Sequence, residues 1–358
     1  MVAPVVISVD AMSGDHGHTV TVDAALLALK EISELSLILV GDESALARTL
    51  ATHRHVPESR LAIQHASEVV EMDEQPSKAL RGKKDSSLRI AVNLVKDGRA
   101  QAAVSAGNTG ALMATARFVL KTLPGIDRPA IVSAIPSING HVHMLDLGAN
   151  AECTAEQLFQ FAVMGSAIVT AVYGIERPKV ALLNIGEEEI KGNDMIKAAA
   201  ALLGASSLNY TGFVEGDGIF LSDIDVVVCD GFVGNIALKT GEGVAKMMRQ
   251  FMQEEFTRSI FTKTAAAMAM PALKALGKRM DPRHYNGASF AGLNGIVIKS
   301  HGSADALSFA NAIRVAVLEV ERDVPARISK LLEVALAKPP CAAGLAPPCT
   351  GSEKASVA

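Results

Sequence analysis

Short apolar runs recur along the chain, each followed by a turn of small and polar residues and then by a segment of helix-forming residues. The runs are apolar at nearly every position, which is typical of parallel strands that are buried on both faces of a sheet. Strands that alternate with helices in this way predict an α/β sandwich with a mostly parallel sheet. The expected strands cover residues 5–9, 37–40, 61–65, 101–104, 130–135, 143–147, 179–185, 210–214, 226–229 and 296–299, with a hairpin turn at Asn139-Gly140.

The stretch from Ala103 to Ala114 shows this pattern most clearly. Its strand ends at Val104, a turn of sequence Ser-Ala-Gly-Asn-Thr-Gly follows, and a helix is expected over residues 111–120. The two glycines let the turn approach a ligand, and the first N–H groups of the helix are unpaired. The turn can therefore hold a phosphate, and an ordinary strand-to-helix connection is the alternative. It is not a nucleotide P-loop, because no Gly-Lys-Ser/Thr sequence follows at the required spacing.

Chemically active residues also follow the first and the last predicted strands. Residues 10–17 bring two carboxylates, a histidine and two glycines to a strand end, which is where open α/β sheets bind their ligands. Alternatively, Asp15 or Thr19 is only the cap of the next helix. Lys299 ends the last strand and His301 follows in a Gly/Ser loop, an arrangement that suits anion binding or proton transfer, with a capped surface loop as the alternative.

Three more strand ends combine glycine with polar side chains, at residues 146–150, 184–193 and 230–235. The second holds three consecutive glutamates, 187–189, together with Lys191. These carboxylates could bind a divalent metal or orient a group. We favour a salt-bridged loop, because no second cluster of carboxylates accompanies them.

A polar segment at residues 71–85 contains Pro76 and a run of cations. It predicts either a mobile loop whose basic face meets an anionic partner or the solvated face of a helix. The cations are Lys78, Arg81, Lys83 and Lys84.

Two segments raise the question of a membrane. Residues 158–175 carry no charge over almost a bilayer-spanning length, but they include polar residues and follow the capping-box sequence Thr154-Ala-Glu-Gln157, so we expect a buried core or interface helix. After a helix expected from residue 236, residues 247–280 are rich in Met and Phe and predict a helical hairpin whose second arm starts at Pro271. This hairpin is a membrane-contacting tip, a dimer interface or ordinary core.

Composition limits the classes of protein. With 358 residues, of which 49% are hydrophobic and 20% charged, the chain can form one large domain or two fused ones with a sizeable core. Aromatic residues make up 4% and Trp is absent, so this core must be aliphatic. The net charge of -4 and the pI of about 6.2 argue against nucleic acid as a partner.

The N-terminus and the cysteines bear on localisation and metal binding. The chain does not start with a basic segment followed by an apolar run, so we expect no secretory signal. Cys153, Cys229, Cys341 and Cys349 form no Cys-x-x-Cys pair, which argues against a zinc site and favours reduced thiols in a cytoplasmic enzyme. Residues 339–358 combine Pro with small residues and are expected to be a disordered tail.

Taken in order, six stretches resemble the bacterial phosphate acyltransferases of phospholipid synthesis. Enzymes of this family convert acyl-acyl-carrier-protein and inorganic phosphate into acyl phosphate. Two departures are Ser13, where the family usually has glycine, and the tail at 339–358. The stretches are Asp10-Ala-Met-Ser-Gly-Asp15, Ser105-Ala-Gly-Asn-Thr-Gly-Ala111, Leu145-Asp-Leu-Gly-Ala-Asn150, residues 182–193, Asp230-Gly-Phe-Val-Gly-Asn235, and Tyr285-Asn-Gly-Ala-Ser289 with Ile298-Lys-Ser-His-Gly302, which together span roughly residues 5 to 335.

The resemblance implies a fold, a quaternary structure and partners. The fold would be a three-layer α/β/α sandwich with a parallel-rich mixed sheet, akin to phosphotransacetylases and to isocitrate and isopropylmalate dehydrogenases. One acyltransferase domain would cover residues 1–338, and the hairpin at 247–280 would protrude as a membrane tip. The protein would be a homodimer attached peripherally to the inner face of the cell membrane, and a glycerol-3-phosphate acyltransferase would act downstream. No cofactor or metal is implied, and the cations of segment 71–85 would meet the acidic carrier protein.

On this resemblance we predict roles for individual residues. Phosphate must attack a thioester carbonyl, so the protein has to hold an anion and stabilise an oxyanion. Lys299 and His301 are expected to supply positive charge or a proton, and Asp10 and Asp15 to orient His301 or the loops. The expected phosphate ligands are Ser105, Gly107, Asn108, Thr109 and Gly110, and the further polar donors are Asn150, Asn184 and Asn235.

Other functions stay open at this point. The runner-up enzyme is a phosphotransacetylase that uses coenzyme A thioesters, and a requirement for a carrier protein separates the two. A non-catalytic membrane scaffold for lipid-synthesis enzymes is a further alternative. A dehydrogenase of the related fold is less favoured, because the chain has no Gly-x-Gly-x-x-Gly sequence. Nothing requires a covalent enzyme intermediate, since a Gly-x-Ser-x-Gly elbow is absent as well.

Overall fold

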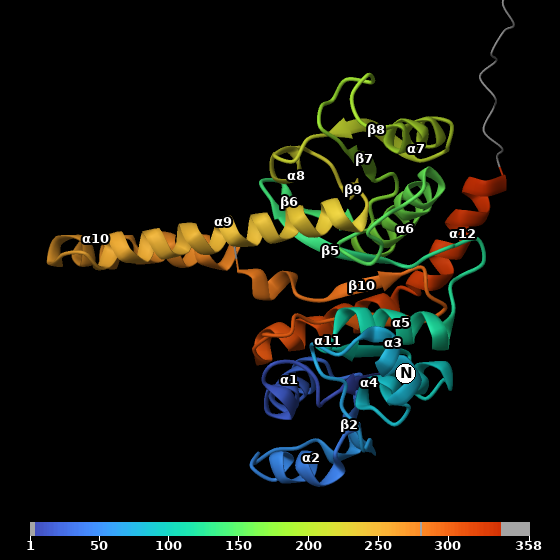
Figure 1. The fold of residues 1–358 in the computed structure, drawn as a ribbon. Coiled ribbons are helices and arrows are strands. Elements are labelled where there is room, and N and C mark those ends of the chain that lie inside the picture. The colour runs from blue at the N-terminus through green and yellow to red at the C-terminus, as the bar shows by residue number, and fades with distance from the viewer. Residues whose placement is uncertain (1–3, 280, 338–358) are drawn as a thin grey trace, which may run out of the picture.

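A single sheet of eleven strands forms the centre of the molecule (Figure 1). The computed structural model describes residues 4–279 and 281–337. Along the sheet the strand order is β3-β2-β1-β4-β11-β10-β5-β6-β9-β7-β8. The strands are β1 (Val5–Asp10), β2 (Leu35–Gly41), β3 (Leu61–His65), β4 (Ala102–Ser105), β5 (Ala130–Ser137), β6 (Gly140–Leu145), β7 (Lys179–Leu183), β8 (Asn209–Val214), β9 (Val226–Val228), β10 (Ala288–Ala291) and β11 (Ile296–Lys299).

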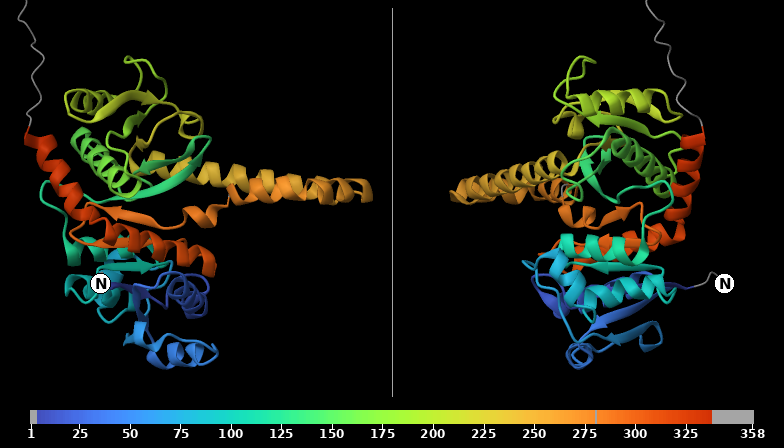
Figure 2. Two further views of the ribbon diagram at one scale, coloured as in Figure 1. Left: turned by 180° about the vertical axis from the view of Figure 1, so that it is seen from behind. Right: turned by 45° about the vertical axis from the view of Figure 1, so that its right-hand side comes forward.

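Helices cover both faces of the sheet, which confirms the expected three-layer α/β/α sandwich (Figures 1 and 2). Buried aliphatic side chains of α1, α11, α6 and α12 pack on one face, and those of α4 and α5 on the other. The helices are α1 (Gly17–Glu31), α2 (Glu43–Leu50), α3 (Pro76–Gly82), α4 (Ser87–Lys96), α5 (Thr109–Leu120), α6 (Ala155–Tyr173), α7 (Asp194–Gly204), α8 (Gly218–Leu221), α9 (Gly231–Thr257), α10 (Ile260–Arg279), α11 (Ala306–Glu321) and α12 (Val324–Ala337), with short 3-10 turns η1 (Glu58–Arg60) and η2 (Pro282–Tyr285).

The two halves of the sheet run in opposite directions. Strands β3, β2, β1, β4 and β11 are parallel, and so are β6, β9, β7 and β8. Strand β10 lies antiparallel between β11 and β5, and β5 forms an antiparallel hairpin with β6. The carboxyl ends of β1, β4 and β11 therefore lie at one end of the sheet, which we call the near end. The carboxyl ends of β6, β7 and β9 lie at the opposite end, which we call the far end.

Each strand that the sequence predicts is present. The hairpin of β5 and β6 turns at Ile138 and Asn139, one residue earlier than expected, and Gly140, with a φ of 118°, begins β6 opposite Ser137. Strand β10 was not predicted. Its sequence, Ala-Ser-Phe-Ala, is short and neither continuously apolar nor alternating, and it becomes a strand because β11 and β5 pair with it on both sides. Tertiary pairing thus overrides a weak local signal.

Helix α6 is a core helix. It is the one helix within residues 4–279 and 281–337 that is long and apolar enough to cross a membrane, and 72% of its apolar stretch is buried. The expected capping box is present, since the N–H of Gln157 donates to Thr154 Oγ1 and the N–H of Thr154 to Gln157 Oε1. A Cβ at Gly165 would lie 2.6 Å from Val226 Cγ1, so helix and sheet are in close contact there.

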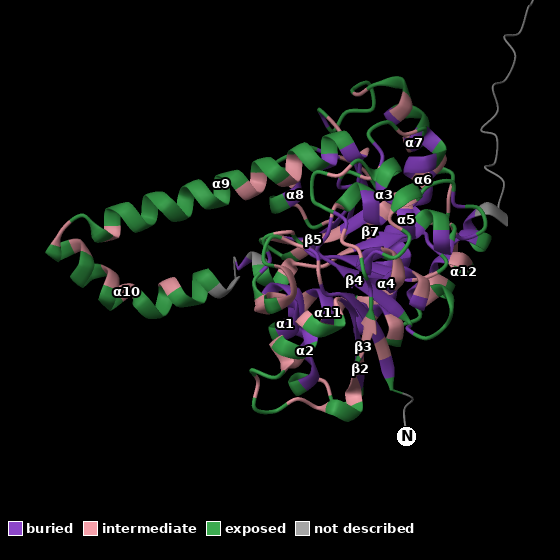
Figure 3. Cartoon of the chain, turned by 60° about the horizontal axis from the view of Figure 1, so that its bottom comes forward, coloured by how far each residue is buried: buried purple, intermediate pink, exposed green. Residues whose placement is uncertain are grey.

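Helices α9 and α10 form a hairpin that projects from the sandwich, and most of its residues are exposed (Figures 1 and 3). Two expectations about its boundaries are wrong. Helix α9 begins at Gly231 instead of 236, because Asp230 caps it by accepting the N–H of Val233 at 2.9 Å. Helix α10 begins at Ile260 and contains Pro271 in its interior, because the hydroxyl of Ser259 supplies an earlier start by accepting an N–H at 3.1 Å.

Segment 71–85 is a loop followed by helix α3 and not one continuous loop. Pro76 begins this helix at its first position, where proline is best tolerated. Of the two structures that the sequence allowed for this segment, the helix with a solvated face is therefore the one formed by residues 76–82. The predicted tail at 339–358 lies outside the described residues.

Candidate functional site

Three adjacent strands end together at the near end of the sheet. Asp10 closes β1, Ser105 closes β4 and Lys299 closes β11. In the ladder, Asp10 pairs with Ser105 and Ser105 pairs with Lys299, so these residues lie side by side. The register thus brings together two of the predicted catalytic residues and one of the predicted phosphate ligands.

Asp10 and Ser105 form the buried floor of this cluster. Ser105 Oγ donates to Asp10 Oδ2 at 2.6 Å and accepts the N–H of Gly107 at 3.0 Å, and Ser13 Oγ lies 3.2 Å from the same hydroxyl. Burial raises the pKa of the Asp10 carboxyl, and the bonds from Ser105 and Ser13 oppose this shift. Asp10 therefore orients the turn after β4 through Ser105 and is too enclosed to touch a substrate itself.

Lys299 places a cation beside the same turn. Its side chain is 9% exposed, and its Nζ donates to the carbonyls of Ala106, at 3.2 Å, and Ser300. Burial lowers the pKa of Lys299 to about 8, while the carboxylates of Asp10 and Asp15 act to raise it. At neutral pH the ammonium is thus still mostly protonated, with little water to neutralise its field.

His301 lies at the surface of the loop after β11. Its N–H donates to Asn286 Oδ1 at 2.9 Å, and its Nδ1 lies 2.9 Å from Ser303 Oγ. Partial burial lowers the pKa of His301, and the neighbouring Lys239 and Lys299 lower it further. A neutral imidazole held by Ser303 can exchange a proton or donate one hydrogen bond.

The first and last loops of the near end are joined at Asp15. Its N–H donates to the carbonyl of Gly302 at 2.9 Å. The expectation that Asp15 or Thr19 caps helix α1 is wrong: His16 holds the cap position without a side-chain bond, and the Thr19 hydroxyl donates to the carbonyl of His16 at 3.0 Å. Asp15 therefore belongs to the loop that faces Gly302 and acts on Lys299 electrostatically.

The side-chain amide of Asn108 forms hydrogen bonds to other groups of the protein. Its Oδ1 accepts the N–H of Ala111 at 3.0 Å and so caps helix α5, and its Nδ2 donates to the carbonyls of Met72, at 2.8 Å, and Glu74, at 3.0 Å. An anion held by this turn would meet backbone N–H groups and not the Asn108 amide.

The remaining predicted ligands of the turn differ in their surroundings. Gly107 is buried, and a Cβ there would lie 3.1 Å from Ser13 Cβ, so only glycine fits easily. Thr109 and Gly110 are exposed in the first turn of α5. A Cβ at Gly110 would lie 2.8 Å from Pro76 Cγ, which shows that α3 packs closely on this helix.

Asn150, Asn184 and Asn235 follow β6, β7 and β9, whose carboxyl ends lie at the far end of the sheet. Asn150 is buried and its Nδ2 donates to Asp146 Oδ2 and to the carbonyl of Pro129, at 2.9 Å each. These bonds hold the loop after β6 in place.

Asn184 lies in the loop after β7, and Asn235 lies in the first turns of α9. Asn184 Nδ2 donates to the carbonyl of Gly186 at 3.0 Å, within its own loop. Asn235 is exposed on the first turns of α9, and a Cβ at Gly148 would lie 3.6 Å from its Cβ. Asn235 precedes Lys239 by one turn of α9, and the charge of Lys239 acts on the pKa values of Lys299 and His301.

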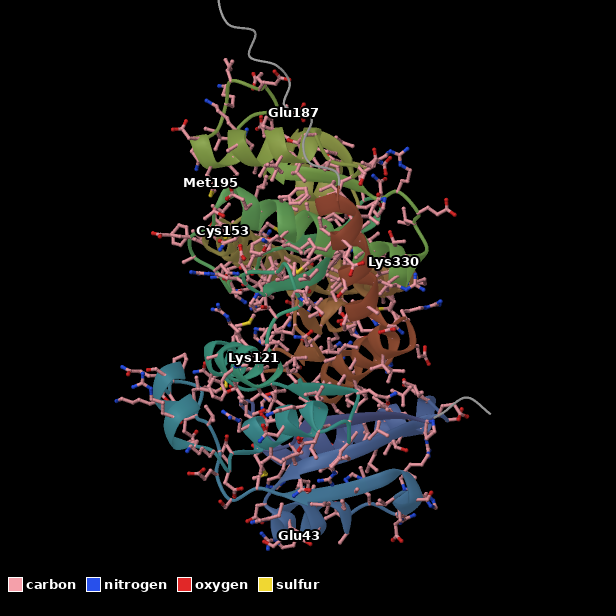
Figure 4. All side chains as sticks on the ribbon, turned by 90° about the vertical axis from the view of Figure 1, so that its right-hand side faces the viewer. Glu43, Lys121, Cys153, Glu187, Met195 and Lys330 are labelled. Atoms are coloured by element: carbon pink, nitrogen blue, oxygen red, sulfur yellow. The ribbon has the colours of Figure 1, made fainter. Side chains whose placement is uncertain are left out.

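The acidic loop after β7 is open to solvent, and its three glutamates, residues 187–189, are exposed. Figure 4 shows Glu187 at one extreme of the molecule and Glu43 at the other. The expected ion pairs of Lys191 with these glutamates are not formed, and over 4–279 and 281–337 no group of His, Cys, Asp and Glu side chains could hold a metal ion.

Helix α9 connects the two ends of the sheet. It starts at the far end, and further along it the charges of Lys239, Glu242 and Lys246 act on the pKa of His301. Lys239 also forms an ion pair with Glu242 at 2.9 Å. Sequence reasoning missed these three charged residues, although Glu242 and Lys246 follow Lys239 by three and seven residues, a spacing that places them on one side of the predicted helix.

The near end therefore combines buried Lys299, further cations on α9, and the backbone N–H groups of a glycine-containing turn at a helix N-terminus. Such a set of groups can bind a phosphate-sized anion and stabilise negative charge that develops beside it.

The sequence is similar to one protein family over most of its length. The family described as "Fatty acid synthesis protein" matches residues 5–327. The chain is 60% identical over 329 residues to the phosphate acyltransferase of Nitrosococcus oceani, which covers 92% of this chain and 97% of that protein. It is 61% identical over 324 residues to the phosphate acyltransferase of Methylococcus capsulatus, covering 90% and 96%.

Solved structures with a related fold are more distant in sequence. A phosphotransacetylase from Staphylococcus aureus superposes with a TM-score of 0.58 at 17% identity, covering 88% of this chain and 94% of that one. A 4-hydroxythreonine-4-phosphate dehydrogenase from Klebsiella pneumoniae gives a TM-score of 0.51 at 14% identity, covering 90% and 100%. At these identities the likeness concerns the fold alone.

Proposed function

We propose, from the premise that this chain belongs to the fatty acid synthesis protein family and is a phosphate acyltransferase, that it moves a fatty acyl group from acyl-acyl-carrier-protein to inorganic phosphate. The acyl phosphate would then serve phospholipid synthesis. The observation that carries the proposal is the position of buried Lys299 beside the turn of residues 105–110. Its Nζ donates to the carbonyl of Ala106, and this places a cation next to the turn that leads into the N-terminus of α5.

In the proposed reaction, a phosphate oxygen attacks the carbonyl carbon of the thioester. A C–O bond to phosphate forms, the C–S bond breaks, and its electron pair leaves on sulfur as a thiolate that takes a proton from solvent. By analogy with cysteine, a leaving thiol with a pKa of about 8.5 departs without strong acid assistance. Since phosphate is already an anion, the protein has mainly to hold it, aim it and stabilise the oxyanion.

The near-end residues divide these tasks. Lys299 would bind phosphate through its ammonium, and the N–H groups that open α5 would bind the remaining oxygens. Asp10 would act as a positioning residue through Ser105, and Asp15 through the loop at Gly302. His301 would donate to the substrate or pass a proton at the open side of the site.

The carrier protein would dock on the basic side of α3. Lys78 and Arg81 on α3 and Lys84 just after it are exposed there, next to the turn that α3 contacts through Pro76. Lys83 is less free to take part, because it forms an ion pair with Glu74 at 2.7 Å. A cluster of exposed cations beside the site suits an acidic protein that delivers its acyl chain to that site.

The hairpin of α9 and α10 would provide membrane contact and dimer contacts, since a lipid surface or a second copy would remove its exposed apolar side chains from water. The protein would then be cytoplasmic, homodimeric and peripherally attached to the inner membrane face, where a glycerol-3-phosphate acyltransferase receives the product. Loss of vesicle binding by an Ile260→Ser, Phe261→Ser variant with turnover retained would support this role. The apolar residues that are at least half exposed on the hairpin include Met248, Phe251, Ile260, Phe261 and Met268.

We take residues 1–338 as one catalytic unit with this hairpin as an extension. The continuous sheet supports this division, because strands from both halves of the sequence pair through β10 and β5.

The test of the function is a transfer assay with the purified protein. Palmitoyl-carrier protein and phosphate are supplied, free thiol is titrated, and the product is trapped with hydroxylamine. Phosphate-dependent thiol release with an equal amount of hydroxamate is expected. Release from palmitoyl coenzyme A alone would favour the phosphotransacetylase-like alternative, and no release from either thioester would favour a non-catalytic scaffold.

A further inference from the structure

The chain of residues 69–75, here called the strap, runs across the near end of the sheet. Just before it, Glu68 forms an isolated parallel bridge with Ser86. Just after it, Pro76 begins α3, and the close contact of Pro76 with Gly110 attaches α3 to α5. Both ends of the strap are therefore fixed to elements that border the candidate phosphate turn.

The middle of the strap is attached to the turn by polar contacts. Asn108 Nδ2 donates to the carbonyls of Met72 and Glu74, at 2.8 and 3.0 Å. The carboxylate of Glu74 in turn pairs with Lys83 at 2.7 Å, and Lys83 Nζ also donates to the carbonyl of Val69 at 2.5 Å. These bonds fix the backbone at position 72 while leaving its side chain free to make other contacts.

The Met72 side chain reaches from the strap to the loop after β11. A Cβ at Gly302 would lie 3.0 Å from Met72 Cε and 3.8 Å from the carbonyl oxygen of Ala106. That carbonyl is the one to which Lys299 donates. The methyl group of Met72 is thus a near neighbour of the groups around the candidate anion site.

This methionine is an apolar side chain in polar surroundings. It is 44% exposed, and its chain neighbours Glu71 and Asp73 are exposed acids. It is therefore not held there by core packing. An exposed, flexible thioether next to an anion site offers an adaptable apolar surface to the rest of the substrate.

We propose that Met72 contacts the first methylene groups of the acyl chain and so favours fatty acyl chains over acetyl, which has no methylene group. This inference rests on the proposed function. When phosphate is held at Lys299 and attacks the carbonyl, the groups bonded to that carbonyl must lie close by. On one side these are the acyl methylenes, which an apolar methyl group can remove from water.

The test compares kcat/KM for palmitoyl-carrier protein and acetyl-carrier protein in wild type and Met72→Ala. Both substrates have the same carrier and the same thiol arm, so only the chain differs. Met72→Ala is expected to lower kcat/KM for the palmitoyl substrate roughly four-fold or more relative to the acetyl substrate, as loss of about one buried methylene contact implies. Equal losses for both substrates, or no loss, would overturn the proposal.

Two further variants separate specificity from damage to the strap. Met72→Leu keeps the apolar volume and is expected to keep the wild-type ratio, whereas Met72→Gln keeps the length and is expected to behave like Met72→Ala. Val334→Ala removes an exposed apolar side chain of α12 and should leave both rates unchanged. Turnover of palmitoyl-carrier protein by the wild type tests the proposed function. The role of Met72 is tested separately, by the change in the ratio of kcat/KM for the palmitoyl substrate to kcat/KM for the acetyl substrate.

Discussion

Ser105 shows how single residues organise the near end. It stands in the ladder between Asp10 and Lys299, bonds to Asp10 at 2.6 Å and accepts the N–H of Gly107 at 3.0 Å. Asp10 is fully buried, and only its Oδ2 accepts a side-chain hydrogen bond, while Oδ1 has no hydrogen-bond partner among the described residues. Burial therefore raises the pKa of this carboxyl. The bonds of Ser105 orient the turn that we propose to hold phosphate.

The ionisation of Lys299 gives a prediction at this scale. Burial lowers its pKa to about 8, so the cation is lost as the pH rises through that value. If Lys299 binds phosphate, kcat/KM for phosphate should fall above pH 8 in wild type. In Lys299→Arg this fall should move to higher pH, because a guanidinium stays protonated. Initial rates from pH 6 to 10 at subsaturating phosphate measure the effect.

The control is the pH dependence of kcat for the same proteins at saturating phosphate, where the rate no longer depends on how tightly phosphate binds. A fall above pH 8 that persists unchanged in Lys299→Arg would show that another group titrates.

Helix α9 depends on two close approaches at its start. Gly234 packs directly on the carbonyl oxygen of Asp146, with no room for a Cβ, and a Cβ at Gly231 would lie 2.7 Å from the carbonyl oxygen of Asn150. These contacts hold the base of the projecting hairpin against the far-end loop.

Gly234→Ala is expected to lower the free energy of unfolding by roughly 2 kcal/mol or more, because the added methyl group forces the helix away from this loop. Gly243→Ala in the same helix is the matched control, since a Cβ there meets nothing within 4 Å. It should stabilise the protein by up to about 1 kcal/mol through helix propensity. Urea unfolding measures both, and equal effects of the two variants would contradict the packing account.

The exposed cations of α3 give a second prediction at the scale of elements. Reversing Lys78, Arg81 and Lys84 to Glu together should raise the KM for acyl-carrier protein roughly ten-fold, with kcat retained, because docking weakens while the chemistry is untouched. Lys330→Glu on α12 is the control, as it changes an exposed lysine outside this basic face. An unchanged KM would exclude α3 as the docking surface.

Across the whole molecule, stability should respond to the charge of Glu319, which is buried where α11 meets β10. Its Oε2 accepts from Ser289 Oγ at 3.1 Å, and burial raises its pKa from 4.5 to about 7. Between these values the folded state binds a proton that the unfolded state lacks. The contribution is fully present below pH 4.5 and is lost as the pH rises through about 7.

In Glu319→Gln the side chain has nearly the same shape as glutamate and is uncharged at all pH values. It should match wild type near pH 4.5 and exceed it at pH 8 by about 3 kcal/mol, the free energy of the raised pKa. Denaturant unfolding at both pH values measures the difference, with the exposed Glu321→Gln as control. A difference that does not change with pH would show that Glu319 is not buried as a neutral acid.

The sequence predicted most of the architecture because the strands are short apolar runs with clear turn signals. It did not reveal that the two halves of the sheet run in opposite directions, since direction depends on the antiparallel pairing of the unrecognised strand β10 and of the hairpin. For this reason the sequence does not reveal that the strands before Asn150, Asn184 and Asn235 end at the far end of the sheet.

The sequence also did not reveal which hydrogen bonds and contacts the side chains near the site make. The Asn108 amide looks like a ligand for phosphate in the turn sequence, yet it caps α5 and holds the strap. Met72, Lys239 and Lys246 come near the site only through folding of distant segments. By contrast, Asp10, Ser105 and Lys299 were recognisable, because Lys299 closes a predicted strand and Asp10 and Ser105 directly follow one.

The central claim, that phosphate itself attacks the thioester, is tested most directly by isotope transfer. The protein is given palmitoyl-carrier protein and phosphate in which all oxygens are oxygen-18, in ordinary water, and the acyl phosphate is analysed by mass spectrometry. We expect a product that retains every heavy oxygen of the phosphate, with one carrier thiol released for each product molecule. Thiol release that yields only free palmitate, or none that depends on phosphate, would contradict the account.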